Sequence, residues 1–187
     1  MKRIATLTLD VALMLNFGAV GVYAQQATVM LSFSGTAEPS TITLQAGAVT
    51  TEYHFAGNTM LGPFTFRLVN ATSQPPGACP ATSHSYLGAG VFRFQDGSLL
   101  MVSVTQGSDC IELTSSGPVA HCTRTLQITG GTGRFKNASG GTIALTGTIL
   151  PVLFDATNDP VLLVVTGELT GAVSGVAMGE EGQNGRQ

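Results

Sequence analysis

Apolar and polar residues alternate along most of the chain, with the two-residue period of a β-strand that buries one face. Turn-forming residues separate these segments roughly every 8 to 12 residues, the spacing of an all-β sandwich or barrel. No stretch of about ten residues combines a helical period with a capping residue. The sequence therefore predicts an all-β fold of roughly nine to eleven short strands. They are expected at residues 27–34, 49–55, 64–68, 91–95, 99–104, 110–113, 121–128, 143–149, 152–154, 161–165 and 169–173.

The strands are expected to form one domain, a single antiparallel β-barrel of about eight or more strands, with a β-sandwich as the alternative. Two segments carry further local predictions. Asp96-Gly97 lies between two strand-like runs, which predicts a hairpin with a type I′ turn because both residues tolerate a positive φ. The run 161–165 is apolar without alternation, which predicts burial on both faces or a central position in the sheet.

The N-terminus has the pattern of a secretory signal peptide. A positive start at Lys2 and Arg3 precedes a mostly apolar stretch at 11–22, and small residues follow it. The apolar stretch is too short to span a bilayer, so no membrane span is expected. We therefore predict a secreted or periplasmic protein with a signal peptide (1–24), a β-barrel domain (25–178) and a flexible tail (179–187).

Charged residues are scarce: 19 of the 187 residues are Lys, Arg, Asp or Glu, whereas glycine and threonine number 24 each. Average globular chains carry about 25% charged residues. A net charge of −3, with 8 Lys and Arg spread along the chain, excludes the basic patch of a nucleic-acid binder. With 43% apolar residues the chain is also too hydrophobic for a disordered protein. Frequent turns need glycine, and threonine suits a half-exposed pleated surface.

Three cysteines, Cys79, Cys110 and Cys122, lie in the predicted exported part. Exported cysteines are oxidised where the geometry permits. Cys110 and Cys122 flank a turn at 114–118, and a hairpin closed there would place them opposite each other, so we favour this disulfide. In the alternative, Cys79 bridges to one of them and ties the loop 73–85 to the barrel wall. The three histidines share no ligand spacing with the cysteines, so no metal site is predicted.

A glycine-rich segment follows one of the central predicted strands. Its first three glycines allow a sharp turn and a close backbone approach, after which a phenylalanine can fold back into the core. A later glycine allows a kink where the next strand begins. A phosphate-binding loop would need a helix after the glycines, whereas this segment continues as a strand. We therefore interpret it as a structural turn built on Gly130, Gly131, Gly133, Phe135 and Gly140.

The run Gly-Gly-Thr-Gly-Arg-Phe at 130–135, followed by Ala138 and Gly140, resembles the signature of the dirigent and allene oxide cyclase-like β-barrels, a calycin-like group. It is also similar to a segment of uncharacterised exported bacterial proteins. The resemblance covers 127–145, and elsewhere only the strand rhythm agrees. It implies a barrel of about eight strands that binds hydrophobic small molecules and, in some members, steers a cyclisation or radical coupling. The acid and pocket motifs of that group match no segment here, so the resemblance assigns no catalytic residue.

Few ionisable residues fall on the predicted strands. Glu52 and His54 lie two residues apart and therefore share one face of a strand. If that face lines the barrel, His54 can act as a general base oriented by Glu52; on the outer face, which we expect, both are solvated. Arg124 shares an apolar face with Cys122 and Leu126, either buried against a carboxylate or, as we expect, at a rim with its stem packed on the sheet. These three ionisable residues are the weak catalytic candidates.

Three functions of different classes are compatible with these features. We favour a non-catalytic exported barrel that binds a small apolar ligand or serves as a structural or interaction module. An isomerase or cyclase-like enzyme, as the resemblance implies, would use Glu52, His54 or Arg124 and no cofactor. A surface or matrix adhesion unit would contact carbohydrate or other copies through its Thr/Gly-rich outer strands. A solidly packed barrel interior would remove the site of both the enzyme and the ligand carrier.

Overall fold

The computed structural model describes residues 25–72, 76–80, 82–84 and 86–177. The predicted signal peptide 1–24 and tail 179–187 lie outside the described residues. The predicted all-β class is confirmed, since the described part has a single helical element, the one-turn 3-10 helix η1 (Gly133–Phe135). Within the described residues, no helix has the length and hydropathy needed to cross a membrane.

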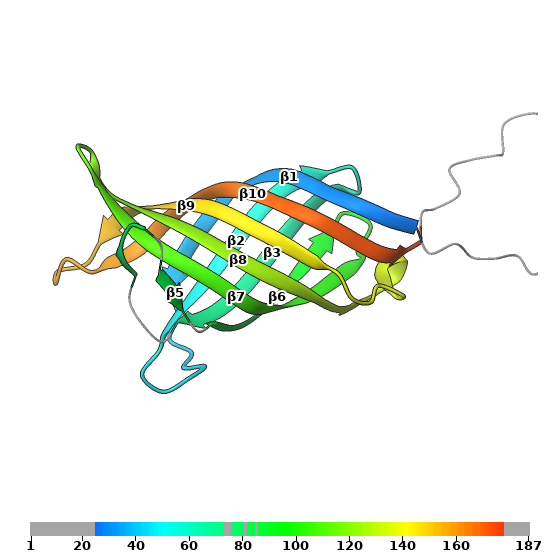
Figure 1. The fold of residues 1–187 in the computed structure, drawn as a ribbon, viewed down its shortest axis with the longest axis horizontal. Coiled ribbons are helices and arrows are strands. Elements are labelled where there is room, and N and C mark those ends of the chain that lie inside the picture. Colours follow the sequence, from blue (N-terminus) through cyan, green and yellow to red (C-terminus); the bar gives the residue numbers. More distant parts are fainter. Residues whose placement is uncertain (1–24, 73–75, 81, 85, 178–187) are drawn as a thin grey trace, which may run out of the picture.

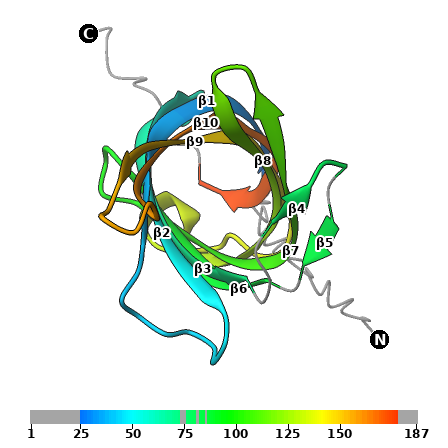
Figure 2. The same ribbon diagram turned by 90° about the vertical axis from the view of Figure 1, so that its left-hand side faces the viewer.

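Eight antiparallel strands form a closed ring, so the barrel is confirmed over the sandwich (Figures 1 and 2). Each ring strand pairs with the next one along the chain, and β1 closes the ring by pairing with β10. The short strands β4 (Gly77–Ala78) and β5 (Thr82–His84) pair with the second half of β7. The ring strands are β1 (Gln25–Pro39), β2 (Val49–Thr59), β3 (Gly62–Thr72), β6 (Tyr86–Phe94), β7 (Leu99–Thr114), β8 (Gly117–Gly131), β9 (Thr142–Phe154) and β10 (Pro160–Val176).

The ring strands are fewer and longer than the predicted ones, because β7, β9 and β10 each combine two predicted segments. In β9, Leu150 and Pro151 separate the two segments, and in β7 and β10 polar residues and glycines interrupt the apolar pattern. Such residues do not end a strand in a barrel, since outward positions need no apolar side chain and glycine can still pair through its backbone. The joined segments are 99–104 with 110–113, 143–149 with 152–154, and 161–165 with 169–173.

Of the two alternatives predicted for the apolar run 161–165, burial on both faces is wrong, whereas a central position in the sheet holds for 163–165, which pair with both β1 and β9. Val165 is fully buried, but the four residues before it are only partly buried. They pair with the last part of β9, residues 150–154, which pairs with β10 alone because the pairing of β8 with β9 ends at Ile149. The end of the β9–β10 hairpin therefore extends past the ring (Figure 1).

The hairpin predicted at Asp96-Gly97 joins β6 to β7, but its turn type differs from the prediction. Gly97 has a φ of +80°, whereas Asp96 has no positive φ. The Gly97 N–H donates to the Phe94 carbonyl oxygen at 3.0 Å, and the Phe94 N–H donates to the Ser98 carbonyl oxygen at 3.0 Å. The loop is therefore a three-residue loop, a type I turn followed by one left-handed glycine, and not the two-residue type I′ turn.

Aromatic side chains form a continuous column along the barrel interior. The Phe66 and Phe92 rings stack with their centroids 3.9 Å apart, and the other rings of the column meet at tilted angles. Buried aliphatic side chains from the other strands surround the column. From one end of the barrel to the other, the column contains Tyr53, Phe55, Phe66, Phe92, Phe64, Phe94 and Phe135.

Inward-facing glycines make room for the aromatic rings of the core, those of the column and that of Phe33. A Cβ atom on Gly167 would lie 2.1 Å from the Thr146 carbonyl oxygen and 2.8 Å from Cζ of Phe33. A Cβ atom on Gly90 would lie 2.6 Å from the Phe66 ring. The aromatic rings thus rest directly on strand backbone, which only a residue without a side chain allows. Part of the high glycine content therefore serves core packing, in addition to the turns that composition suggested.

Candidate functional site

A buried ion pair lies inside one end of the barrel. Nη1 of Arg124 (β8) is 2.6 Å from Oδ1 of Asp109 (β7), and Nη2 is 2.9 Å from Oδ2, so the guanidinium binds both carboxylate oxygens. Nη1 also donates to the Thr123 carbonyl oxygen at 2.7 Å. Arg124 is 4% exposed and Asp109 is 7% exposed. The prediction that Arg124 lies at a rim is therefore wrong. The alternative, burial against a carboxylate, is confirmed.

A β-bulge explains why Asp109 faces inward. In the first half of β7, Val102 and Val104 are buried, which predicts inward positions at even numbers. Between Val104 and Gln106, β7 then contains one more residue than the paired part of β8. One extra residue moves every later side chain to the opposite face, so odd-numbered residues face the interior from there on. Asp109 is thereby placed on the same face as Arg124.

The register of the β7–β8 hairpin, whose two-residue turn pairs Thr114 with Gly117, overturns the favoured disulfide between Cys110 and Cys122. Cys110 is bonded to Cys79, and Cys122 is a buried free thiol. In the β7–β8 register, Cys110 lies opposite His121, and Cys122 lies opposite Asp109. Cys110 and Cys122 therefore project to opposite sides of the barrel wall. The alternative pairing through Cys79 holds, and it ties the β4 segment to the outside of β7.

Two other titratable side chains, Tyr53 and Cys122, lie beside Arg124. Burial raises the pKa of Tyr53 to about 12, although the positive charge of Arg124 acts in the opposite direction. Burial also raises the pKa of the Cys122 thiol to about 11. A cavity of about 10 Å³ lies between these side chains, with Phe55, Leu68, Leu145 and Val165 completing its wall. That volume is close to what one water molecule needs.

Alkaline pH is expected to destabilise the protein through Tyr53 and Cys122. Between the ordinary pKa of each group, 10.0 or 9.0, and its raised value, the unfolded chain releases a proton that the folded chain keeps. These two groups should therefore leave the free energy of unfolding unchanged below about pH 9, and each should lower it by about 1.4 kcal/mol per pH unit between its ordinary and its raised pKa. Urea unfolding as a function of pH measures this. Cys122→Ala should flatten the fall between about pH 9 and 11, and an identical pH profile in wild type and variant would contradict the assignment.

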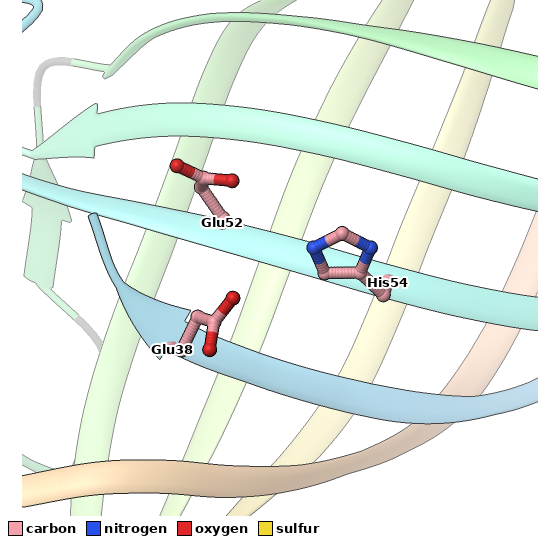
Figure 3. Close-up of side chains that lie close together, drawn as sticks. All are labelled: Glu38, Glu52 and His54. Carbon is pink, nitrogen blue, oxygen red and sulfur yellow. The ribbon is translucent and has the colours of Figure 1, made fainter. Parts of the chain in front are cut away.

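Glu52 and His54 lie on the outer face of β2, as expected (Figure 3). Tyr53 between them is buried and faces inward. The structure adds Glu38 of β1, which lies directly opposite Glu52 in the β1–β2 register. One donor atom from each of Glu38, Glu52 and His54 lies within 4.8 Å of the others. The Ser40 hydroxyl donates to Oε1 of Glu52 at 2.5 Å. Glu38 is exposed, and Glu52 and His54 are half-buried.

The three weak catalytic candidates therefore do not form one site. Arg124 lies inside the barrel, whereas Glu52 and His54 lie outside it. Asp109 and Glu38 were not found from the sequence. The alternation of β1 continues to Glu38 and would have placed it on the outer face, but its contact with Glu52 depends on the register with β2.

The glycine-rich turn closes the other end of the barrel. Phe135 is fully buried and contacts the Phe94 ring with centroids 4.8 Å apart. The Arg134 guanidinium lies 4.7 Å from the Phe94 centroid and 5.1 Å from that of Phe135, and its Nε is 3.4 Å from Oδ2 of Asp96. This cation therefore covers the end of the aromatic column. Gly130 and Gly131 end β8, while Gly133 and Gly140 have φ values of +58° and +68°.

No model of a known protein family matches the chain, and neither a curated protein nor a solved structure matches it. The function must therefore be inferred from the arrangement of this chain's own residues. Two features matter most for that inference: the filled interior and the side chains displayed outside.

Proposed function

We propose that this protein is an exported, non-catalytic β-barrel that acts as a structural or interaction module through its outer surface. The observation that carries the proposal is the filled interior. The aromatic column occupies the barrel axis, and the cavity beside Arg124 measures about 10 Å³. Pockets for small molecules have volumes of roughly 300 to 1,000 Å³.

A filled interior also weighs against an enzyme of the allene oxide cyclase type. Such an enzyme would bind its substrate in the barrel, next to the ionisable side chains that act on it. Arg124 is the one weak catalytic candidate inside, and its guanidinium is held by both oxygens of Asp109. An arginine in a two-point ion pair has little capacity left for a substrate.

The outer surface offers two features that suit an interaction module. The β9–β10 hairpin extends past the ring and exposes apolar side chains, and exposed apolar patches mark interaction sites. A shallow open hollow of about 390 Å³ lies over β8, β9 and β10, with threonines and Glu168 among its lining residues. The exposed residues of the hairpin include Leu150, Val152, Leu153 and Phe154, at 43%, 51%, 54% and 43%.

Export is supported by two independent features. The Cys79–Cys110 disulfide is of a kind that persists in oxidising compartments. The pattern of residues 1–24 is that of a signal peptide.

Native mass spectrometry of the exported protein tests the proposal. We expect to observe only the mass of the bare chain with one disulfide. In a separate fluorescence titration, we expect no saturable binding of an apolar fluorescent fatty-acid analogue. Apolar ligands of the size of retinol or larger should likewise leave the fluorescence of the buried Tyr53 unchanged. An apolar molecule bound one-to-one, released by denaturation and absent from a matched blank, would overturn the proposal, because it would require a ligand chamber.

A further inference from the structure

We propose that Glu38, Glu52 and His54 form a binding site for Zn²⁺ on the outer face of the barrel (Figure 3). This site does not depend on the proposed function. It joins two neighbouring strands, β1 and β2.

The backbone fixes the relative positions of the three donors. Glu38 and Glu52 are direct cross-strand partners, and His54 follows Glu52 by two residues on the same face of β2. Their donor atoms lie within 4.8 Å of one another. Zinc bonds nitrogen and oxygen at about 2.0 to 2.2 Å, which puts donors of a tetrahedral site about 3.4 Å apart. Rotations of long side chains on fixed strands are enough to cover that difference.

The charges at this position favour a cation. Two like charges directly opposite each other on paired strands destabilise the pairing. Within the described part of the chain, neither Glu38 nor Glu52 has an ion pair with a lysine or arginine. Arg67 lies on β3 opposite His54, on the side away from Glu38. A divalent cation between the carboxylates would therefore replace a repulsion with two attractions.

The donor set favours a transition-metal ion such as Zn²⁺ over Ca²⁺ and Mg²⁺. An imidazole nitrogen with two carboxylates suits Zn²⁺, whereas Ca²⁺ and Mg²⁺ prefer oxygen donors alone. Three protein donors leave a tetrahedral position open to water, which is the arrangement of an accessible site and not of a closed structural one. The hydrogen bond from the Ser40 hydroxyl orients the Glu52 carboxylate, as outer-shell partners of metal ligands do.

Isothermal titration calorimetry with ZnCl₂ on the purified, untagged protein at pH 7.5 tests the site. We expect one Zn²⁺ per chain. His54→Ala and Glu38→Gln should each weaken binding at least about tenfold, since even outer-shell partners of a metal contribute about 10 to 100-fold. Ser40→Ala, which removes an outer-shell partner, should weaken it about tenfold, the lower end of that range. Millimolar Ca²⁺ or Mg²⁺ should not displace the zinc.

A second histidine–glutamate pair provides the matched control. Nε2 of His121 lies 2.9 Å from Oε2 of Glu112 on the outer surface of β7 and β8, and among the described residues no third His, Cys, Asp or Glu completes a group with them. His121→Ala should leave Zn²⁺ binding unchanged, and all variants should keep the wild-type circular dichroism spectrum because the side chains lie outside the core. X-ray absorption of the zinc-loaded protein should show nitrogen and oxygen ligands and no sulfur. Absence of binding, equal binding in His54→Ala, or loss of binding in His121→Ala would each overturn the proposal.

Discussion

Replacing Arg124 with alanine is expected to lower the free energy of unfolding by about 3 to 5 kcal/mol. The substitution leaves the Asp109 carboxylate buried, without the guanidinium that now binds both of its oxygens. It also removes the charge next to Tyr53. Urea unfolding under oxidising conditions, with the Cys79–Cys110 bond intact, measures the loss.

A double variant separates the ion pair from the volume of the side chains. Arg124→Met combined with Asp109→Leu removes both charges and fills the space, and it should recover most of the lost stability. His121→Ala is the matched control, because it breaks an exposed pair on the same two strands and should cost no more than about 1 kcal/mol. A loss for Arg124→Ala as small as that of His121→Ala would show that the buried pair does not stabilise the fold.

Replacing Gly133 with valine is expected to lower the free energy of unfolding by about 2 to 4 kcal/mol. Gly133 has a φ of +58°, which is unfavourable for a β-branched residue. Its new Cβ would lie 2.4 Å from the Ser98 hydroxyl oxygen, which accepts a hydrogen bond from the Arg134 N–H and donates one to Asp96. The clash therefore disturbs the contacts that close this end of the barrel. The thermal midpoint and the urea midpoint both report it.

Gly140→Val separates the two causes. Gly140 has a similar φ of +68°, but a Cβ there would have no atom within 4 Å. This control should therefore show the backbone strain alone and cost about 1 to 2 kcal/mol. Equal losses in both variants would mean that the contact with Ser98 contributes nothing.

The barrel itself was largely predictable from the sequence. Alternation with period two identified the inward face of most strands, because burial selects apolar side chains at every second position. The outward positions of Glu52 and His54 follow from the same rule. Strand ends were less predictable, since an apolar run such as 161–165 can lie on a hairpin that extends past the ring.

The interior site was not predictable, because a single inserted residue decided it. The bulge between Val104 and Gln106 places Asp109 inside and Cys110 outside. Neither Asp nor Cys is a residue type that indicates a bulge. In a strand without the bulge, Asp109 would face outward and Cys110 would face the interior. The position of the buried ion pair depends on this shift, and the cross-strand partner of Cys110 depends on the two-residue turn between β7 and β8.

Local sequence thus determined the elements of this protein: alternating strands, glycine turns and an apolar barrel wall. These properties arise from neighbours along the chain, so the chain alone encodes them. Tertiary structure decided which side chains meet, including Arg124 with Asp109, Cys79 with Cys110, and Glu38 with Glu52 and His54. Those contacts depend on register between strands, and register is set by the closure of the whole ring.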